Sequence, residues 1–267
     1  MAKIIGLAPR LLIAIGIFTA AGSLHGAFST RTIEYPRGIS ALIPLDFLLT
    51  PIAMVLLVTL FLAALTSWTM GIREEPSGWT VVVLLALGLH LSLGHHPIDE
   101  VSNRAVNLPG AGLAAYLIWR KMARMQGDHS RQNRIGFDAF CGIAAICYVL
   151  AGANKIWAPG VAWATGVNLA NHITTHALLG SPIMLDLRLW VASKEVICML
   201  LGVGTLVIEC GFVLFILRKY RPILSILAVV FHLSIGLIVG LHHPDWMFTV
   251  AGLGLHEWLN RPTTKHT

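Results

Sequence analysis

The chain has 267 residues, of which 56% are hydrophobic and only 12% are charged. Its mean hydropathy of +0.74 excludes an ordinary soluble globular protein. A helix needs roughly 20 apolar residues to cross a bilayer. We therefore predict an all-α, polytopic bundle of about eight spans, which forms a single membrane domain over residues 1–267 with no soluble domain.

Spans are expected wherever a long apolar run is bounded by charge, proline or glycine. In chain order these runs cover 9–28, 41–67, 79–95, 108–123, 137–157, 188–217, 221–241 and 246–260. The first run has no small-residue cleavage site of the signal-peptide type, so we interpret it as a retained span.

The formal net charge of +6 has a topological explanation. If both termini are cytoplasmic, most basic residues fall on the inner side: Lys3, Arg10, Arg73, Arg120, Lys121, Arg124, Arg131, Arg134, Arg218, Lys219, Arg221, Arg261 and Lys265. The outer loops hold only Arg31, Arg37, Arg104 and Arg188. Cytoplasmic loops of membrane proteins are enriched in Lys and Arg. The asymmetry therefore predicts an orientation in a cell inner (plasma) membrane and accounts for the charge without nucleic acid.

Histidines gather on the predicted outer side. Residues 168–176 are expected to form a short helix, which places His172 and His176 four residues apart on one face. Two imidazoles so placed can bind one transition-metal ion. Further ligands could come from His95, His96, His242, His243, Asp99 or Asp245. The alternative is a set of polar side chains at the membrane interface.

Lys155 ends the fifth predicted span, at the edge of the hydrocarbon. Desolvation there favours the neutral amine, which can act as a base. Two other interpretations remain: an amine that snorkels to water, and an ion pair with Glu195.

Glu209 and His232 are predicted to lie deeper in the membrane. They stand at similar distances from the basic turn near Lys219, so their depths should be similar and the two side chains can meet. Such a pair could relay protons, or could simply keep two polar groups together in lipid.

A series of motifs runs through the second half of the chain. The first consists of Tyr148, Ala151-Gly152, Lys155-Ile156 and Trp163-Ala-Thr-Gly166. Glu209 in a helix, a basic turn at 218–221 and Phe231-His232 then follow. Over residues 140–258 these motifs resemble the HTTM domain, the membrane domain shared by the vitamin K-dependent gamma-carboxylase and many bacterial proteins.

The resemblance implies a membrane enzyme that acts on a quinol or another lipophilic or small substrate at the periplasmic face. It makes Lys155 the base that deprotonates a hydroquinone, with His232 and Glu209 in supporting catalytic positions. We expect the substrate to bind beside them, at Tyr148, Trp157, Trp163 and Glu195. The chain ends soon after the last span, so we do not expect carboxylation of a protein substrate.

Two alternatives stay open. The nearest competing family is DoxX, which would make the chain a quinone-linked oxidoreductase subunit. The other alternative is a non-catalytic membrane subunit or maturation partner that binds metal through the outer histidines. The cofactors in question are thus a quinone or hydroquinone and a transition metal, and the expected partners are the lipid bilayer, a quinol and another membrane protein.

Overall fold

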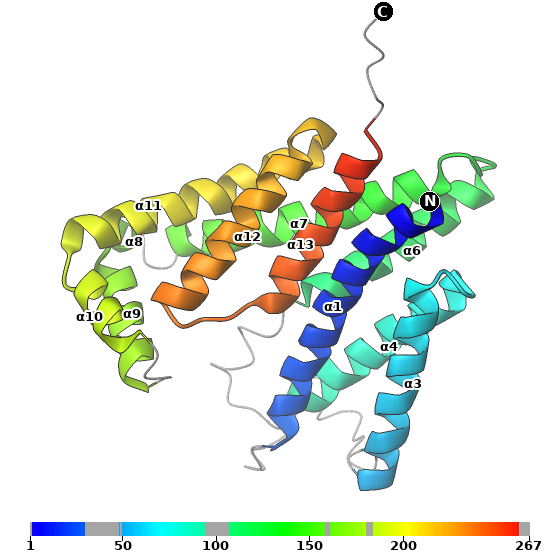
Figure 1. Cartoon of the computed structure of the whole chain (residues 1–267), viewed down its shortest axis with the longest axis horizontal. Coiled ribbons are helices and arrows are strands. Elements are labelled where there is room, and N and C mark those ends of the chain that lie inside the picture. Colours follow the sequence, from blue (N-terminus) through cyan, green and yellow to red (C-terminus); the bar gives the residue numbers. More distant parts are fainter. Residues whose placement is uncertain are drawn as a thin grey trace, which may run out of the picture. The chain divides into compact units, whose positions relative to one another are not determined.

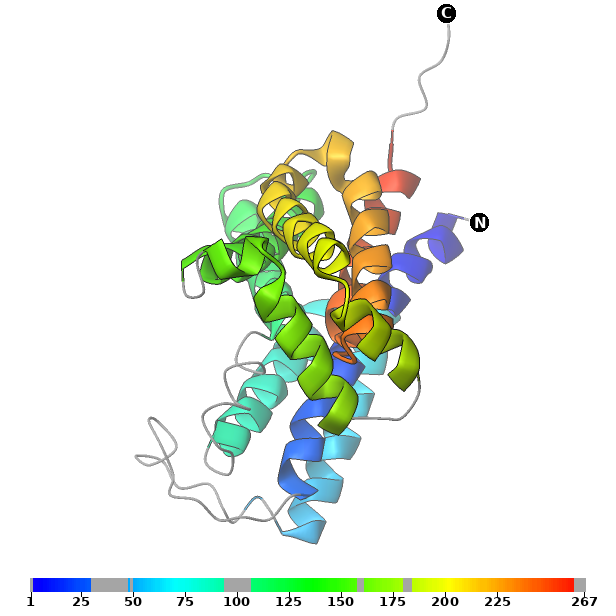
Figure 2. The ribbon, with the colours of Figure 1, turned by 90° about the vertical axis from the view of Figure 1, so that its left-hand side faces the viewer.

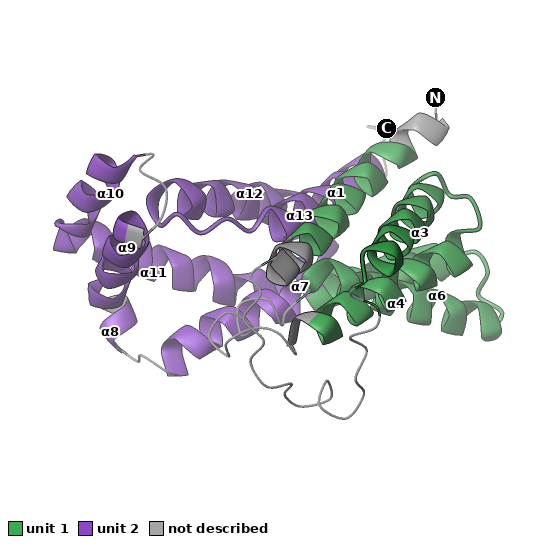
Figure 3. Cartoon of the chain, turned by 90° about the horizontal axis from the view of Figure 1, so that it is seen from below, with its two compact units in different colours: residues 1–143 green, residues 144–267 purple. Residues whose placement is uncertain are grey.

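The computed structural model describes residues 2–29, 48, 50–93, 107–157, 161–179 and 184–261. The elements in these ranges are all helices, which confirms the predicted all-α class (Figure 1). The chain divides into two compact units, residues 1–143 and 144–267 (Figure 3). Each unit is considered by itself below.

Among the described residues, four helical segments are long and apolar enough to cross a membrane. They are Pro51–Thr69, Gln132–Trp157, Glu195–Ile216 and Arg218–Ile238. Large apolar side chains on them are exposed, for example Ile52 at 77% and Ile226 at 64%. Lipid is the solvent that such faces suit, so these helices indicate a membrane protein in contact with a bilayer.

The first unit contains α1 (Ala2–Ser29), α3 (Pro51–Thr69), α4 (Glu74–Leu93) and α6 (Leu108–Met125). A partly buried polar contact joins three of them. Glu74, at the start of α4, accepts hydrogen bonds from Arg10 of α1 at 2.9 Å and Tyr116 of α6 at 2.7 Å. Arg120 forms an ion pair with the same carboxylate at 3.1 Å.

α7 (Gln132–Trp157) runs from the first unit into the second. The second unit continues with α8 (Val161–Ala164), α9 (Val167–Leu179), α10 (Leu185–Ala192), α11 (Glu195–Gly211), the 3₁₀ segments η2 (Phe212–Ile216) and η3 (Arg218–Tyr220), α12 (Arg221–Ile238) and α13 (Pro244–Leu259). α12 and α13 pack side by side, and α9 packs against α10 and α11 (Figures 1 and 2).

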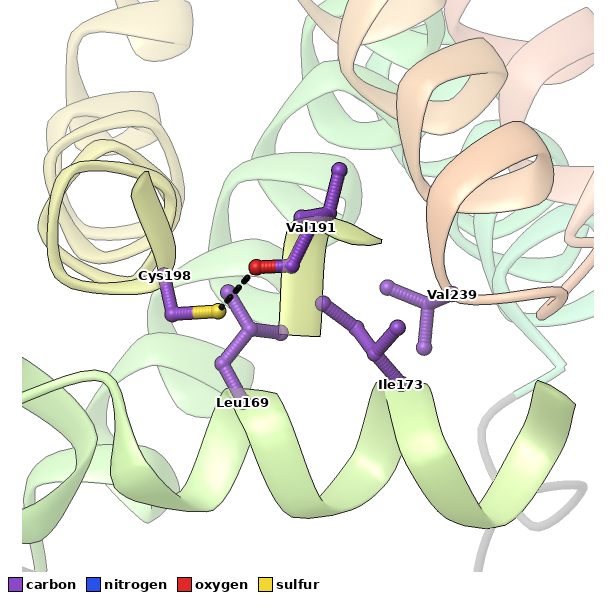
Figure 4. Close-up of a cluster of buried hydrophobic side chains, with 5 residues drawn as sticks. All are labelled: Leu169, Ile173, Val191, Cys198 and Val239. Carbon is purple, nitrogen blue, oxygen red and sulfur yellow. Dashed lines mark hydrogen bonds between the residues drawn. The ribbon is translucent and has the colours of Figure 1, made fainter. Parts of the chain in front are cut away.

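A small apolar cluster fixes the short helices of this unit. Its members are Leu169, Ile173, Val191, Cys198 and Val239, drawn in Figure 4. The Cys198 thiol also donates to the Val191 carbonyl oxygen at 3.3 Å. Burying each large aliphatic side chain contributes about 1.5–3 kcal/mol. The cluster therefore holds α9 and α10 against α11 and the end of α12.

The predicted span over 188–217 is divided into several elements. Lys194 has an extended backbone, with φ −109° and ψ 93°, so α10 ends at Ala192 and α11 begins at Glu195. Beyond Gly211 the chain tightens into η2. The predicted start of the second span, 41–47, lies outside the described residues, and α3 begins at Pro51.

A buried arginine explains the 3₁₀ turn. The side chain of Arg221, in the first turn of α12, is only 2% exposed. It donates to the carbonyl oxygens of Phe215 and Ile216, both at 3.0 Å, and binds Glu257 of α13 at 2.8 Å. The guanidinium satisfies carbonyls that a helix end leaves without a partner, and so it ties η2 to α12 and α13.

Candidate functional site

Glycines let the helices of the second unit approach closely. A Cβ at Gly152 of α7 would lie 2.8 Å from Cys210 Sγ and 3.1 Å from Glu209 Cβ, both on α11. Gly166 has φ +80°, and a Cβ there would meet the backbone of Met199. Only glycine suits that conformation and that contact. These two glycines, both part of the first sequence motif, therefore place α7 and α8 directly against α11.

Lys155 and Glu209 face each other across this contact. The Lys155 ammonium lies 2.6 Å from Oε1 and 2.8 Å from Oε2 of Glu209. The two side chains are 25% and 7% exposed. In a bidentate contact of this kind, largely shielded from water, each charge compensates the other, and removal of one would leave its partner without compensation.

Trp163 lies over the same lysine. Lys155 Nζ is 5.4 Å from the centre of the indole ring, within the range of a cation–π interaction. The indole N–H of Trp163 is buried and has no hydrogen-bond partner among the described residues. A buried donor without a partner costs free energy, and an acceptor oxygen on a bound molecule would remove that cost.

Tyr148 lies in an aromatic box, seven residues before Lys155 on α7. Its ring stacks on Phe212 at 4.0 Å and meets Trp246 edge-on at 5.0 Å. Its hydroxyl lies 2.6 Å from Nε2 of His232 on α12. Both residues are buried, at 1% and 8% exposure. The box thus brings α7, η2, α12 and α13 together around one polar pair.

The loop between α12 and α13 adds further ionisable groups. The rings of His243 and His232 are 6.1 Å apart. Burial, together with the charges of Lys155 and His242, lowers the pKa of His243. Burial raises the pKa of Asp245 to about 6, although backbone N–H groups at the start of α13 oppose this shift.

The predicted helix over 168–176 is confirmed as α9. The rings of His172 and His176 lie 6.3 Å apart and nearly parallel. Partial burial, then the charges of His176 and Lys155, lower the pKa of His172. Within the described part of the chain, no three His, Cys, Asp or Glu side chains gather closely enough to hold a metal ion. His95 and His96 lie outside the described residues.

The other predicted site residues are more scattered. Trp157, at the end of α7, is 90% exposed. Glu195 is exposed at the start of α11, and the carboxylate that Lys155 binds is Glu209 instead. Their similar depth would have allowed Glu209 and His232 to meet, but each has a different partner: Lys155 for Glu209 and Tyr148 for His232.

Sequence reasoning missed two members of the site. Phe212 stacks on Tyr148 because η2 turns inward just after α11. Trp246 packs against both Tyr148 and His232. Both residues follow a helix break, at Gly211 and at the 240–243 loop, and those breaks are the signals that could have revealed them.

Comparison with known proteins returns no match from any source: no family model, no curated protein and no solved structure.

Proposed function

We propose that this chain is a multi-pass membrane enzyme of the HTTM type, which binds a hydroquinone in its second unit and removes a proton from it at Lys155. The observation that carries the proposal is the ion pair between Lys155 and Glu209. Intramembrane ionisable residues are costly and usually functional. Here a basic and an acidic group share a hydrogen bond next to a buried, unused indole donor.

The pair can act as a base without leaving a net charge. Transfer of one proton from the Lys155 ammonium to the Glu209 carboxylate gives a neutral amine and a neutral acid, forms that low-dielectric surroundings favour. The amine then takes the proton of a phenolic hydroxyl. The products are an ammonium and a phenolate, and Glu209 holds the first proton until it is released. The phenolate is the form of a hydroquinone that reacts with dioxygen.

Trp163 supplies a binding contact of the right kind. Its indole N–H can donate to the oxygen of a quinol or quinone, and its ring already lies over the lysine. A phenolic oxygen held between the indole N–H and Lys155 Nζ would be positioned for proton transfer. The exposed apolar faces of α11 and α12 suit entry of a lipophilic substrate from the bilayer.

The membrane arrangement belongs to the same proposal. The chain crosses an inner (plasma) membrane about eight times with both termini in the cytoplasm, and its site opens toward the outer face. The distribution of Lys and Arg supports this orientation. On this arrangement the end of α7 and the loop between α12 and α13 meet the periplasm.

The test is quinol-dependent oxygen consumption by protein purified into lipid nanodiscs. Lys155→Met should lower the rate by about 100-fold or more, in the range expected for loss of a general base. Lys194→Met is the matched control, because Lys194 is exposed and lies before α11. Equal rates in wild type and Lys155→Met would refute the proposal. Quinone binding without turnover would instead favour a DoxX-like subunit that needs a partner protein.

A further inference from the structure

The Tyr148–His232 pair has one more hydrogen-bond donor than it uses. If the phenol donates to Nε2, the neutral imidazole carries its hydrogen on Nδ1. That atom is buried and has no partner among the described residues. If Nε2 donates instead, the phenolic hydrogen is the unused one. In both tautomers, the two residues share a 2.6 Å hydrogen bond and keep one further proton for which the described residues provide no acceptor.

The neighbouring rings limit where that proton can go. Among the described residues, the rings of Tyr148, Phe231, His243 and Trp246 contact His232. Phe231 carries no exchangeable proton, and the indole of Trp246 is a donor only. His243 is therefore the one ring besides Tyr148 that can accept from His232. At 6.1 Å between ring centres, one bridging water or a small rotation completes the contact.

His243 also lies close to solvent. It precedes α13 in the loop after α12, its side chain is half-buried, and its neighbour His242 is exposed. The charged groups that act on it are Lys155 of α7 and His242. Burial and these charges lower the pKa of His243, so its imidazole is neutral at neutral pH and free to accept a proton.

The charges around the buried pair come from three helices. Lys155 of α7 acts on His232 together with His243. Glu209 of α11 and Asp245 of α13 act on Tyr148. The pair is thus close enough to the Lys155–Glu209 contact and to the loop after α12 to feel the charges of both.

We propose that Tyr148, His232 and His243 form a path that carries protons from the substrate site to the outer surface. The path rests on the proposed function, since the proton it carries is the one taken from the substrate. Glu209 releases the proton that it holds and returns to its ion pair with Lys155, and this proton arrives at the Tyr148 oxygen as the phenolic proton passes to Nε2 of His232. The Nδ1 proton of His232 passes to His243 and then to water. His232 changes tautomer, and no net charge stays behind.

A substrate-free exchange experiment tests the path in nanodiscs. Protein with ¹⁵N-labelled histidine is transferred to heavy water, and NMR follows the loss of the His232 ring N–H signal, which is assigned by its absence in His232→Asn. Because the path connects His232 to water, solvent deuterons should reach this ring through His243. We expect the exchange to become at least about tenfold slower in His243→Asn, because the relay group is lost.

His242→Asn is the matched control and should keep the wild-type exchange rate, because His242 is exposed and takes no step in the path. In His243→Ala, added imidazole should restore the fast exchange, which a purely structural role for His243 would not allow. A wild-type exchange rate in His243→Asn, or an equal slowing in His242→Asn, would overturn the path. Because no substrate is used, a protein with a working path but no Lys155-dependent oxidation would refute the proposed function alone.

Discussion

The ammonium of Lys155 lies within 2.8 Å of both carboxylate oxygens of Glu209, a residue 54 positions further along the chain. This contact depends on close packing of α7 against α11, which Gly152 permits. The same α7 face presents Tyr148 to His232 two turns earlier. One helix thus carries both polar pairs of the second unit, so substitutions on α7 and its partners test the site directly.

Glu209→Gln should destabilise the protein by roughly 1–3 kcal/mol, because it leaves the Lys155 ammonium beside Trp163 without its counter-charge. This loss is below the range for a fully buried pair, since the Lys155 side chain is 25% exposed. The double variant Lys155→Met, Glu209→Gln should recover part of the loss. Thermal unfolding in detergent measures both effects as a double-mutant cycle.

Glu195→Gln is the control for that cycle, because Glu195 is an exposed acid at the other end of α11. It should leave the unfolding temperature nearly unchanged. Strictly additive losses in the double variant would mean that the two charges do not stabilise each other in solution.

Gly152→Ala should lower the free energy of unfolding by about 1–3 kcal/mol, since the added methyl group would lie 2.8 Å from Cys210 Sγ and force α7 and α11 apart. Gly142→Ala on the same helix is the matched control, because a Cβ there meets nothing within 4 Å. The control should be neutral or stabilising by up to about 1 kcal/mol, as expected for Gly to Ala in a helix. Equal effects at the two positions would contradict the close approach of α7 and α11.

Local patterns predicted the helices better than they predicted the contacts. Apolar runs located α7, α12 and α13 within a few residues, and the short helix expected over 168–176 is α9. The α10–α11 break at Lys194 was not located, although Ser193-Lys194-Glu195 interrupts the apolar run at this point. Hydrophobic periodicity reports burial and does not report where the backbone bends.

The pairing of polar side chains was harder to predict than the positions of the helices. Lys155, Glu209 and His232 were identified individually, but Lys155 was assigned to Glu195 in one interpretation and Glu209 to His232 in another. The observed partners depend on the rotation of α11 and α12 about their axes, which depth in the membrane does not fix. For α11, the close contacts at Gly152 and Gly166 limit that rotation, and such contacts become visible only in three dimensions.

Arg221→Met should be among the most destabilising single changes in the second unit, with a loss of about 3 kcal/mol or more. It removes a buried charge from Glu257 and leaves the Phe215 and Ile216 carbonyl oxygens without their donor. Lys219→Met is the control, because Lys219 lies only two residues before Arg221 and its side chain is exposed. We expect near-UV circular dichroism to lose the aromatic signal of the Tyr148–Phe212 stack in Arg221→Met alone. An unchanged spectrum and unfolding temperature would show that η2 holds its shape without the guanidinium.

The last prediction concerns pH. Burial raises the pKa of Asp245 to about 6 from its ordinary 3.8. The folded protein therefore binds this proton more tightly than the unfolded chain does. The stabilising contribution is fully present below about pH 4, is lost as pH rises to about 6, and stays constant above that value.

Asp245→Asn removes the titration while it keeps the size of the side chain. The stability of the variant relative to wild type should therefore rise between about pH 4 and about pH 6, by at most about 3 kcal/mol for a shift of two units. Chemical unfolding of both proteins across this range measures the difference. A difference that is flat with pH, or that falls as pH rises, would mean that the Asp245 carboxyl is as well solvated in the folded protein as in the unfolded chain.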